Sequence, residues 1–383
     1  MWLPMIKKVF PILALSIFSS LLGSGIVLPF LPLYAESMGA SGIWIGLIFA
    51  AFPISRTIAT PIFGRLSDRG GRKPFLAIGL FSYAVISFGF IWANTVFWLV
   101  GVRFLQGIAG GMILPIAQAY IGDISPEGEE GKWMGYANAA FLSGFGFGPL
   151  MGGVLAEHMG MSAAFLAMGS LNLLAFFIVL FFLPGSIHKR SMTDPIVSFW
   201  KLSTNRTING LVSFRIAFSL GRGVLITFLP VFAAVFLGMS PTHIGIMLAV
   251  SVLVQSLLGI PSGRIADRFN RRALVVIGSA VSFGYMALLP WTHSFSQVLG
   301  LTVFGSVGGA LSLAATSAMV VEEGRKVGMG SAIAVFSMAF SIGMAIGPIL
   351  GGVIADFAGV NSAFYFGAAI LFIGTYLFIW LTR

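Results

Sequence analysis

The sequence predicts an all-α integral membrane protein whose twelve transmembrane helices form two pseudo-symmetric six-helix bundles. Three observations predict this class: the composition, the recurrence of long apolar runs, and a repeat that relates the two halves of the chain. Of the 383 residues, 57% are hydrophobic and 9% are charged, and the mean hydropathy is +0.98. Soluble domains carry about 25% charged residues, so this composition excludes a soluble domain.

Twelve apolar runs are each long enough to cross a membrane. A helix needs about 20 apolar residues to span roughly 30 Å of hydrocarbon at about 1.5 Å per residue. The expected spans are 9–34, 42–64, 74–93, 97–121, 132–156, 163–184, 208–236, 243–264, 273–291, 295–320, 328–354 and 361–382. The first run has a basic flank, but it is longer than the apolar part of a signal peptide and no A-x-A cleavage site follows. We therefore expect a retained helix.

The basic residues predict the orientation of the chain. Of the 22 Lys and Arg residues, all but four fall in the termini and in the loops of one side, while the loops of the other side contain none. Basic loops stay cytoplasmic, so we expect a multi-pass protein of the cell inner membrane with both termini in the cytoplasm. This bias accounts for the net charge of +10 without a nucleic-acid partner. The absence of cysteine excludes disulfides and thiolate metal sites.

The two halves of the chain repeat one another. The loop Gly64–Pro74, GRLSDRGGRKP, matches Gly263–Ala273, GRIADRFNRRA, at an offset of 199 residues. Gly144–Phe165 matches Gly343–Phe364 at the same offset, with ten identities in 22 positions. Each half is therefore one copy of a six-helix unit. Parallel repeats of this kind place a substrate site between the halves near the membrane midplane, and the halves rock around it.

The repeat also predicts the domain boundaries. We expect an N-terminal six-helix bundle at 1–184, a cytoplasmic linker at 185–207 and a C-terminal six-helix bundle at 208–383. The linker is either an ordered connection or contains a short interfacial helix around 196–202, where apolar side chains cluster.

Three motifs carry a resemblance to a known family. They are the loop Gly64–Lys73, the segment RFLQG at Arg103–Gly107 and the segment GFGFGPLMGG at Gly144–Gly153. Over essentially its whole length the chain resembles the major facilitator superfamily, and within it the drug:proton antiporter, or tetracycline-exporter-like, branch. The resemblance implies the major facilitator fold and secondary active transport. One position departs from the branch: where a carboxylate would fall in the first helix, this chain has Ser20.

The paired loops suggest a conformational latch. A carboxylate at a helix end can lie against a neighbouring helix N-terminus or pair with an arginine. The resemblance implies that this cluster closes the cytoplasmic side when the carrier faces outward. The alternative is that the charges only anchor the helix ends at the headgroups. The residues assigned to the latch are Gly64, Asp68, Arg69, Arg72, Asp123, Gly263, Asp267 and Arg271.

Glycines spaced four residues apart predict close helix packing. Small residues at this spacing lie on one helix face and let backbones approach, while a proline within the helix removes a hydrogen bond. The residues assigned to packing and to a hinge are Gly144, Gly148, Pro149, Gly152, Gly347, Pro348 and Gly351. They are either packing surfaces between the halves or, in addition, a pivot.

Four arginines fall inside the expected spans: Arg56, Arg103, Arg215 and Arg222. A charge at membrane depth costs at least about 2.5–3.5 kcal/mol, so it normally faces a cavity or a partner. Arg215 lies near a helix end, and we expect it to snorkel to the headgroups. The residues assigned to the substrate cavity are Arg222, Arg56, Arg103, Gln255, Asn138, Gln118, Ser24 and Tyr285, with Ser20, Asn172 and Ser337 as further polar candidates.

We expect a secondary active transporter that moves a small organic solute by alternating access. The motif in the fifth span favours multidrug-like efflux coupled to the proton gradient. The arginines favour instead an organic-anion or zwitterion carrier that uses Arg222, Arg56 and Arg103. A transport-inactive membrane sensor or scaffold is a third hypothesis.

Catalysis and cofactors are not expected. The sequence has no P-loop for ATP and no cluster of acid, histidine and nucleophile within the spans, so we predict that the chain is not an enzyme. We expect no cofactor and no metal. The expected partners are a small-molecule substrate, the lipid bilayer and protons, with the chain acting as a monomer. The proton would be carried by the substrate or by Glu36, Glu157 or Asp123.

Overall fold

The computed structural model describes residues 2–126, 129–185 and 205–382. Within these residues the chain is helical, and twelve helical segments are long and apolar enough to span a membrane. The all-α class and the twelve spans are therefore confirmed. The short helix considered around 196–202 lies outside the described residues.

The described residues of the N-terminal half form seven α-helices and one 3-10 turn. Their bounds are α1 (Trp2–Val27), α2 (Leu31–Ser37), α3 (Gly42–Gly70), α4 (Arg72–Gly89), η1 (Phe90–Trp92), α5 (Val96–Ile124), α6 (Glu130–Met159) and α7 (Met161–Phe182). The short α2 continues the first span, which runs from Ile6 to Ser37.

From residue 205 to residue 382, the C-terminal half forms six long α-helices and one 3-10 turn. Their bounds are α9 (Arg206–Val235), α10 (Pro241–Arg268), α11 (Arg271–Leu288), η2 (Leu289–Trp291), α12 (Phe295–Val327), α13 (Met329–Ala358) and α14 (Val360–Leu381).

The local signals that start and end these helices repeat between the halves. The Thr95 hydroxyl accepts the backbone N–H of Trp98 and caps α5, and Ser294, 199 residues later, caps α12 in the same way. Gly160 separates α6 from α7 with φ of +80°, and Gly359 separates α13 from α14 with φ of +84°. Only glycine adopts such a conformation without strain, so both tight connections depend on it.

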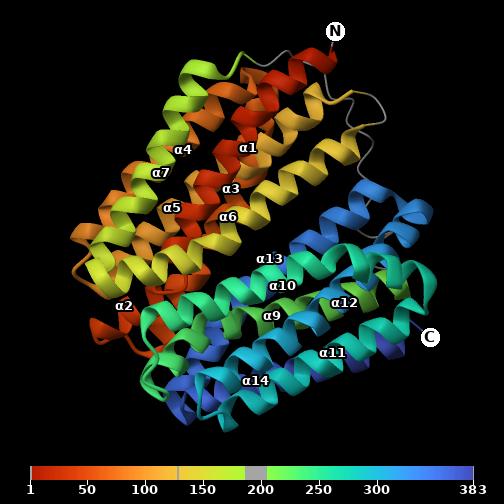
Figure 1. Ribbon diagram of the computed structural model, residues 1–383. Helices are drawn as coiled ribbons and strands as arrows, with labels where there is room; N and C mark the ends of the chain where they lie inside the picture. The colour runs from red at the N-terminus through yellow and green to blue at the C-terminus, as the bar shows by residue number, and fades with distance from the viewer. Residues whose placement is uncertain (1, 127–128, 186–204, 383) are drawn as a thin grey trace. The chain divides into compact units, whose positions relative to one another are not determined.

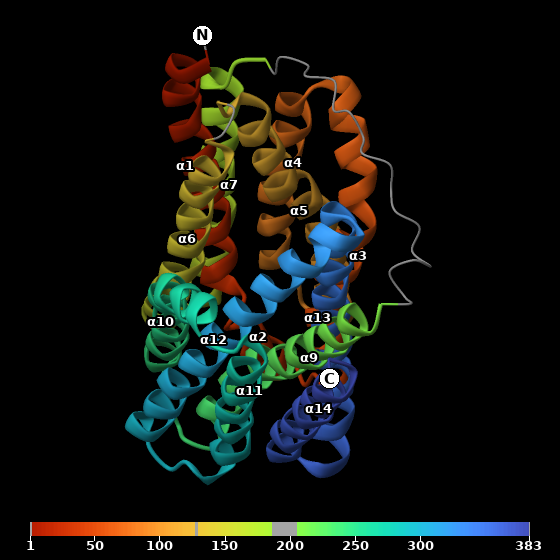
Figure 2. The same ribbon diagram turned by 90° about the vertical axis from the view of Figure 1, so that its right-hand side faces the viewer.

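The residues group into two compact units, and the same helix pairs build each of them. Unit 1 comprises residues 1–39, 51–192 and 240–249, and unit 2 comprises 40–50, 193–239 and 250–383. In unit 1, α1 packs on α6 and α7, and α4 packs on α5 and α7; Figure 1 and Figure 2 both show α1 beside α6 and α7. In unit 2, α9 packs on α13 and α14, and α11 packs on α12 and α14. The structure thus reproduces the repeat seen in the sequence, while the predicted bundle boundaries stay a prediction.

Residues 240–249 come from the C-terminal half but belong to unit 1, and residues 40–50 come from the N-terminal half but belong to unit 2. A carboxylate caps a helix in each of these two segments. In unit 1, Glu157 accepts the backbone N–H of Thr242 at 2.9 Å, in the first turn of α10. In unit 2, Asp356 accepts the N–H of Gly42 and, at 3.0 Å, that of Ile43, in the first turn of α3. A carboxylate at a helix N-terminus satisfies free N–H groups and stabilises the helix dipole.

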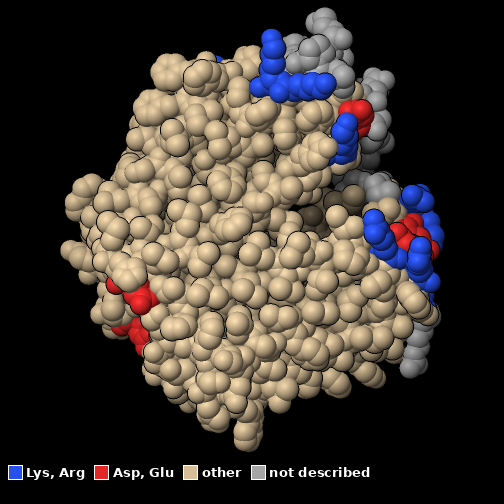
Figure 3. Space-filling view, in the orientation of Figure 1, with Lys and Arg blue, Asp and Glu red and all other residues tan. Residues whose placement is uncertain are grey.

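The surface of the helices suits a lipid environment. Large apolar side chains are exposed along them, including Phe97 at 76% and Leu257 at 76%. Trp92 and Trp291, equivalent positions in the repeat, are each 70% exposed at the ends of α4 and α11, where tryptophan is typical of the membrane interface. On the face shown in Figure 3, charged side chains gather near helix ends and the helix middles are uncharged.

Candidate functional site

A small, mostly apolar cavity that also has polar groups in its lining lies inside unit 1. It has a volume of about 30 Å³ and is lined by four polar side chains together with apolar neighbours. The polar lining residues are Ser20, Ser24, Arg56 and Tyr83. The Ser24 hydroxyl lies 2.7 Å from the Tyr83 hydroxyl. A space of this size can hold one or two water molecules or a small group of a ligand, provided that they lie at the polar side chains of the lining.

Arg56, on α3, is the charged group of this cavity. Its guanidinium lies 6.0 Å from the centre of the Phe52 ring, and no described residue forms a hydrogen bond or ion pair with it. A guanidinium in such surroundings keeps all its donors for water or for a solute that carries an acceptor. Arg56 therefore lines a cavity, and its contact with a transported solute stays a prediction.

Arg103, on α5, is held by its own unit. It is only 6% exposed, its guanidinium lies 4.7 Å from the Phe52 ring centre, and its Nη1 donates to Gln106 Oε1 at 3.0 Å. Gln106 in turn donates to Ser87 Oγ at 3.4 Å. Cation–π and charge-assisted contacts of this kind offset the cost of burying the charge.

Arg222 and Gln255 come together inside unit 2. Arg222, on α9, donates from Nη1 to Gln255 Oε1, on α10, at 2.8 Å. The sequence assigned both residues to the substrate cavity, and the structure places them in direct contact. Nearby on α11, the Tyr285 hydroxyl lies 3.2 Å from the Thr302 hydroxyl of α12.

Arg215 does not extend to a helix end as expected. Its guanidinium lies between two phenylalanine rings of α13, 4.7 Å from the centre of Phe336 and 4.6 Å from that of Phe340. Its Nε is buried and has no hydrogen-bond partner in the described part of the chain. Attraction to two ring faces replaces the headgroup contact that we expected.

The remaining polar candidates are dispersed. Gln118 and Asn138 make no hydrogen bond with a described residue, and neither lines the small cavity of unit 1. Asn172 is fully buried and donates to the Met168 carbonyl at 2.9 Å. Ser337, on α13, is exposed. The structure therefore gives these four residues no shared site.

The predicted latch residues form one ion-pair cluster in each unit. In unit 1, Arg72 pairs with Asp68 and with Asp123, the latter at 2.9 Å, and it also donates to Ser67 Oγ at 2.9 Å. Gly64 and Gly263, which the sequence placed in loops, lie instead in the last turns of α3 and α10, and no atom lies within 4 Å of a methyl group added at either position.

In unit 2, Arg271 lies 2.7 Å from Glu322 and 3.8 Å from Asp267. Glu322 was not predicted, although it stands 199 residues after Asp123. The repeat offset itself could have found it.

The glycines of α6 and α13 pack against helices of their own unit. A methyl group on Gly148 would lie closer than 3.0 Å to Gly25 of α1, and one on Gly347 would lie as close to Leu220 of α9. Gly144 and Gly152 approach α1 in the same way. These glycines bring α6 to α1 and α13 to α9 within each unit. The predicted packing between the two halves of the chain also occurs in this region: a methyl group on Gly245 of α10 would lie closer than 3.0 Å to the Pro149 carbonyl, and one on Gly46 of α3 would lie as close to the Pro348 carbonyl. The role of these residues as a pivot stays a prediction.

The prolines Pro149 and Pro348 and the glycine Gly351 lie at the same helix contacts. A methyl group on Gly25 would lie 3.3 Å from Pro149 Cδ, and one on Gly223 would lie 2.8 Å from Pro348 Cδ. A methyl group on Gly351 would lie 3.0 Å from Val224 and 3.1 Å from Phe228 of α9.

Comparison with known proteins identifies the family. Residues 13–218 and 211–383 match the family described as Major Facilitator Superfamily. The chain belongs to this superfamily.

Relatives and solved structures extend this likeness. Multidrug resistance protein 1 of Bacillus subtilis is 31% identical over 381 residues, which cover 96% of this chain and 95% of that protein. The multi-drug resistance efflux pump PmrA homolog of Lactococcus lactis is 29% identical over 377 residues, covering 92% and 88%. A bacterial homologue of the human lysosomal transporter Spinster, solved in an inward-facing and unoccupied conformation, superposes with a TM-score of 0.87 at 15% identity over 100% of this chain and 98% of that one. That last likeness concerns the fold.

The sequence could have predicted one further contact of this site, that of Arg103 with Gln106. Gln106 follows Arg103 by three residues, so the two side chains share a helix face. The contacts of Thr302 with Tyr285 and of Ser87 with Gln106 join different helices. The sequence does not show which residues of two helices face each other.

Proposed function

We propose that this superfamily member is a secondary active transporter of the cytoplasmic membrane that exports small amphipathic organic compounds by alternating access, driven by the proton gradient. It acts as a monomer, with both termini in the cytoplasm. The observation that carries the proposal is the likeness over nearly the full length to proteins named for multidrug resistance, at 31% identity over 381 residues for one of them.

The contacts of the arginines favour export of amphipathic compounds, cations included. Four unpaired positive charges would repel a lipophilic cation. Arg103 and Arg222 instead donate to glutamine side chains, and Arg215 lies between two aromatic rings. Hydrogen bonds and ring contacts engage these guanidinium groups within their own unit. These neutral partners leave the positive charges in place, but they orient the guanidinium groups and occupy donors of Arg103 and Arg222, which makes these groups poorer binding sites for an anionic solute.

Glu36 is the best candidate for the proton carrier. Asp123 pairs with Arg72, and Glu157 accepts from Thr242. The Glu36 side chain, at the end of the first span, has no ion pair or hydrogen bond with any residue in the described ranges. A carboxylate without a fixed partner can gain and lose a proton without breaking an ion pair, which is what coupling requires.

Transport of organic anions is the second candidate function, and Arg56 favours it. The guanidinium of Arg56 shares a cavity with the hydroxyl groups of Ser20, Ser24 and Tyr83. The Ser24 hydroxyl donates to the Ser20 carbonyl at 3.0 Å and lies 2.7 Å from the Tyr83 hydroxyl, so these two groups already bond to each other. The Arg56 guanidinium and the Ser20 hydroxyl are complementary to a carboxylate or sulfonate group.

A thermal-shift screen separates the two candidates. Ligands that bind the folded protein raise its apparent stability. We expect lipophilic cations such as tetraphenylphosphonium to stabilise the wild type and Arg56→Gln equally. If aromatic carboxylates stabilise the wild type instead, and Arg56→Gln loses that shift, the anion carrier replaces the exporter.

A further inference from the structure

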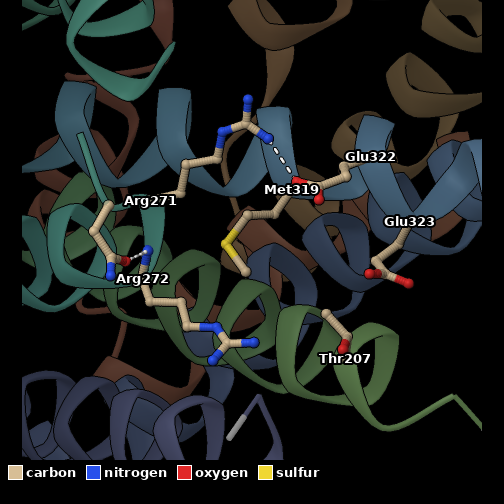
Figure 4. A pocket seen from close by; sticks show the side chains of 7 residues that line it. Thr207, Arg271, Arg272, Met319, Glu322 and Glu323 are labelled. Carbon is tan, nitrogen blue, oxygen red and sulfur yellow. Dashed lines mark hydrogen bonds and ion pairs between the residues drawn. The ribbon is translucent and has the colours of Figure 1, made fainter. Parts of the chain in front are cut away.

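A larger hollow lies at one end of unit 2, apart from the cavity of unit 1 and from the four arginines inside the spans, and the ion pair of Arg271 with Glu322 forms part of its lining. Its volume is about 310 Å³. The beginning of α9, the beginning of α11 and the end of α12 surround it (Figure 4). The lining residues are Thr207, Asn270, Arg271, Arg272, Met319, Glu322 and Glu323.

Most charges of this hollow already have partners. Glu322 lies 2.7 Å from Arg271. Glu323 lies 2.7 Å from Lys326 and accepts from Asn205 at 3.3 Å. These contacts occupy both carboxylates and one of the two guanidinium groups.

The guanidinium of Arg272 differs from the other charged groups of this hollow, which have partners. The backbone N–H of Arg272 donates to Asn270 at 3.0 Å, but its guanidinium forms no hydrogen bond or ion pair with any residue that the structure describes. In Figure 4 the guanidinium extends below Met319 toward the side where Thr207 lies. The Thr207 hydroxyl also lacks a partner among the described residues. The hollow thus combines a free planar cation, a free hydroxyl and a largely buried methionine, which is 7% exposed.

The residues of unit 1 that the repeat relates to this hollow differ from those that line it in unit 2. The position equivalent to Met319 in unit 1 is Tyr120, which is fully buried and donates its hydroxyl to the Pro184 carbonyl at 2.9 Å. The position equivalent to Glu323 is Ile124. The polar lining is therefore particular to unit 2, although the ion pair between Arg271 and Glu322 has a counterpart in unit 1.

We propose that this hollow binds a monoanionic phosphodiester, and that the phosphodiester belongs to the headgroup of an anionic phospholipid. A guanidinium matches two phosphate oxygens with two parallel hydrogen bonds, and Thr207 supplies a further donor. The two carboxylates beside Arg272 disfavour a second negative charge, so a diester fits better than a phosphate monoester. The hollow lies where α11 begins and α12 ends, which is the depth of lipid headgroups for a membrane-spanning helix. Met319 offers an apolar contact to the glycerol of the lipid.

The test uses the full chain purified in detergent and in phosphatidylcholine nanodiscs that contain phosphatidylglycerol. Native mass spectrometry counts the bound phosphatidylglycerol, and a titration of the lipid against thermal stability gives an apparent affinity. We expect Arg272→Gln to weaken that affinity by about tenfold or more, because it removes hydrogen bonds to a charged group as well as one positive charge, and Thr207→Val to weaken it less. Arg268→Gln is the matched control: it removes an exposed base at the end of α10, three residues before α11 begins, that does not line the hollow. The general effect of one surface charge there is at most about fivefold.

Each outcome bears on the proposal. Equal effects of Arg272→Gln and Arg268→Gln would reduce the binding to general surface charge and overturn the site. No preference for phosphatidylglycerol over phosphatidylcholine would also overturn it. Soluble glycerophosphoglycerol distinguishes the source of the phosphate: if it binds as tightly as the lipid, the phosphodiester is right and the lipid is wrong. Inorganic phosphate should bind more weakly than either diester.

Discussion

The contact between α6 and α1 can be tested by one added methyl group. Gly152 faces Ile26 so closely that a methyl group at this position would lie nearer than 3.0 Å to three backbone atoms of Ile26. Backbone atoms in the middle of a helix cannot move aside as the tip of a side chain can. The substitution Gly152→Ala must therefore push the two helices apart.

The expected cost follows from this geometry. Overpacking in a well-packed interior costs typically about 1–3 kcal/mol, and the collision with backbone places Gly152→Ala near the upper end. Gly135→Ala, on the same helix, is the matched control because no atom lies within 4 Å of the position of the new methyl group. An alanine in place of an unconstrained helix glycine stabilises by about 0.4–1 kcal/mol. The two variants should thus shift stability in opposite directions, about 3–4 kcal/mol apart at most.

Thermal unfolding in detergent measures this difference through the fluorescence of the eight tryptophans. We expect a clearly lower melting temperature for Gly152→Ala and an equal or slightly higher one for Gly135→Ala. If Gly152→Ala melts at the temperature of the wild type, or if both variants lose the same amount, the close approach of α6 to α1 is not what requires glycine there.

Three further predictions concern the charged groups. Asp123→Asn removes one of the two carboxylates that pair with Arg72, so the transport rate in reconstituted vesicles should fall while the yield of folded protein is unchanged; an unaltered rate would argue against the latch. Gln255→Leu leaves the Arg222 guanidinium without its acceptor. The free energy of unfolding should therefore drop by about 1.5–3 kcal/mol, the range for hydrogen bonds to charged groups. A melting temperature equal to that of the wild type would show that this bond contributes nothing. Arg215→Gln removes a cation from between two phenylalanine rings and should lower the free energy of unfolding by about 1–2 kcal/mol. Arg215→Lys keeps the positive charge and should lower it less. Equal losses for the two variants would exclude the ring contacts as the cause.

Much of the fold could be predicted from the sequence because the membrane restricts what a chain can form. Backbone groups in hydrocarbon must be satisfied within the helix, so apolar runs such as 273–291 translate directly into helices, here α11. The repeat offset then relates helices of the two halves, and the packing of α1 on α6 recurs as that of α9 on α13.

The sites were less predictable because they depend on side-chain directions. The sequence marked Arg222 and Gln255 as polar residues in spans, but their contact requires a particular crossing of α9 and α10. The position of Arg215 near a helix end predicts a contact with headgroups. The two phenylalanines of α13 that hold it lie more than 120 residues later, and nothing in the sequence places them beside it. Glu322 could have been found from the repeat, whereas Thr302 could not, because nothing in the sequence aligns it with Tyr285.

The most direct test of the central claim is proton-driven transport by the purified chain in liposomes with an imposed pH gradient. Vesicles that contain the wild type should move a labelled lipophilic cation against its concentration gradient, and a protonophore should abolish the movement. Glu36→Gln should bind the same cation but no longer transport it against a gradient. Gradient-independent movement, or full activity of Glu36→Gln, would contradict the assignment of proton coupling to Glu36, and no movement of any lipophilic cation would contradict the export function itself.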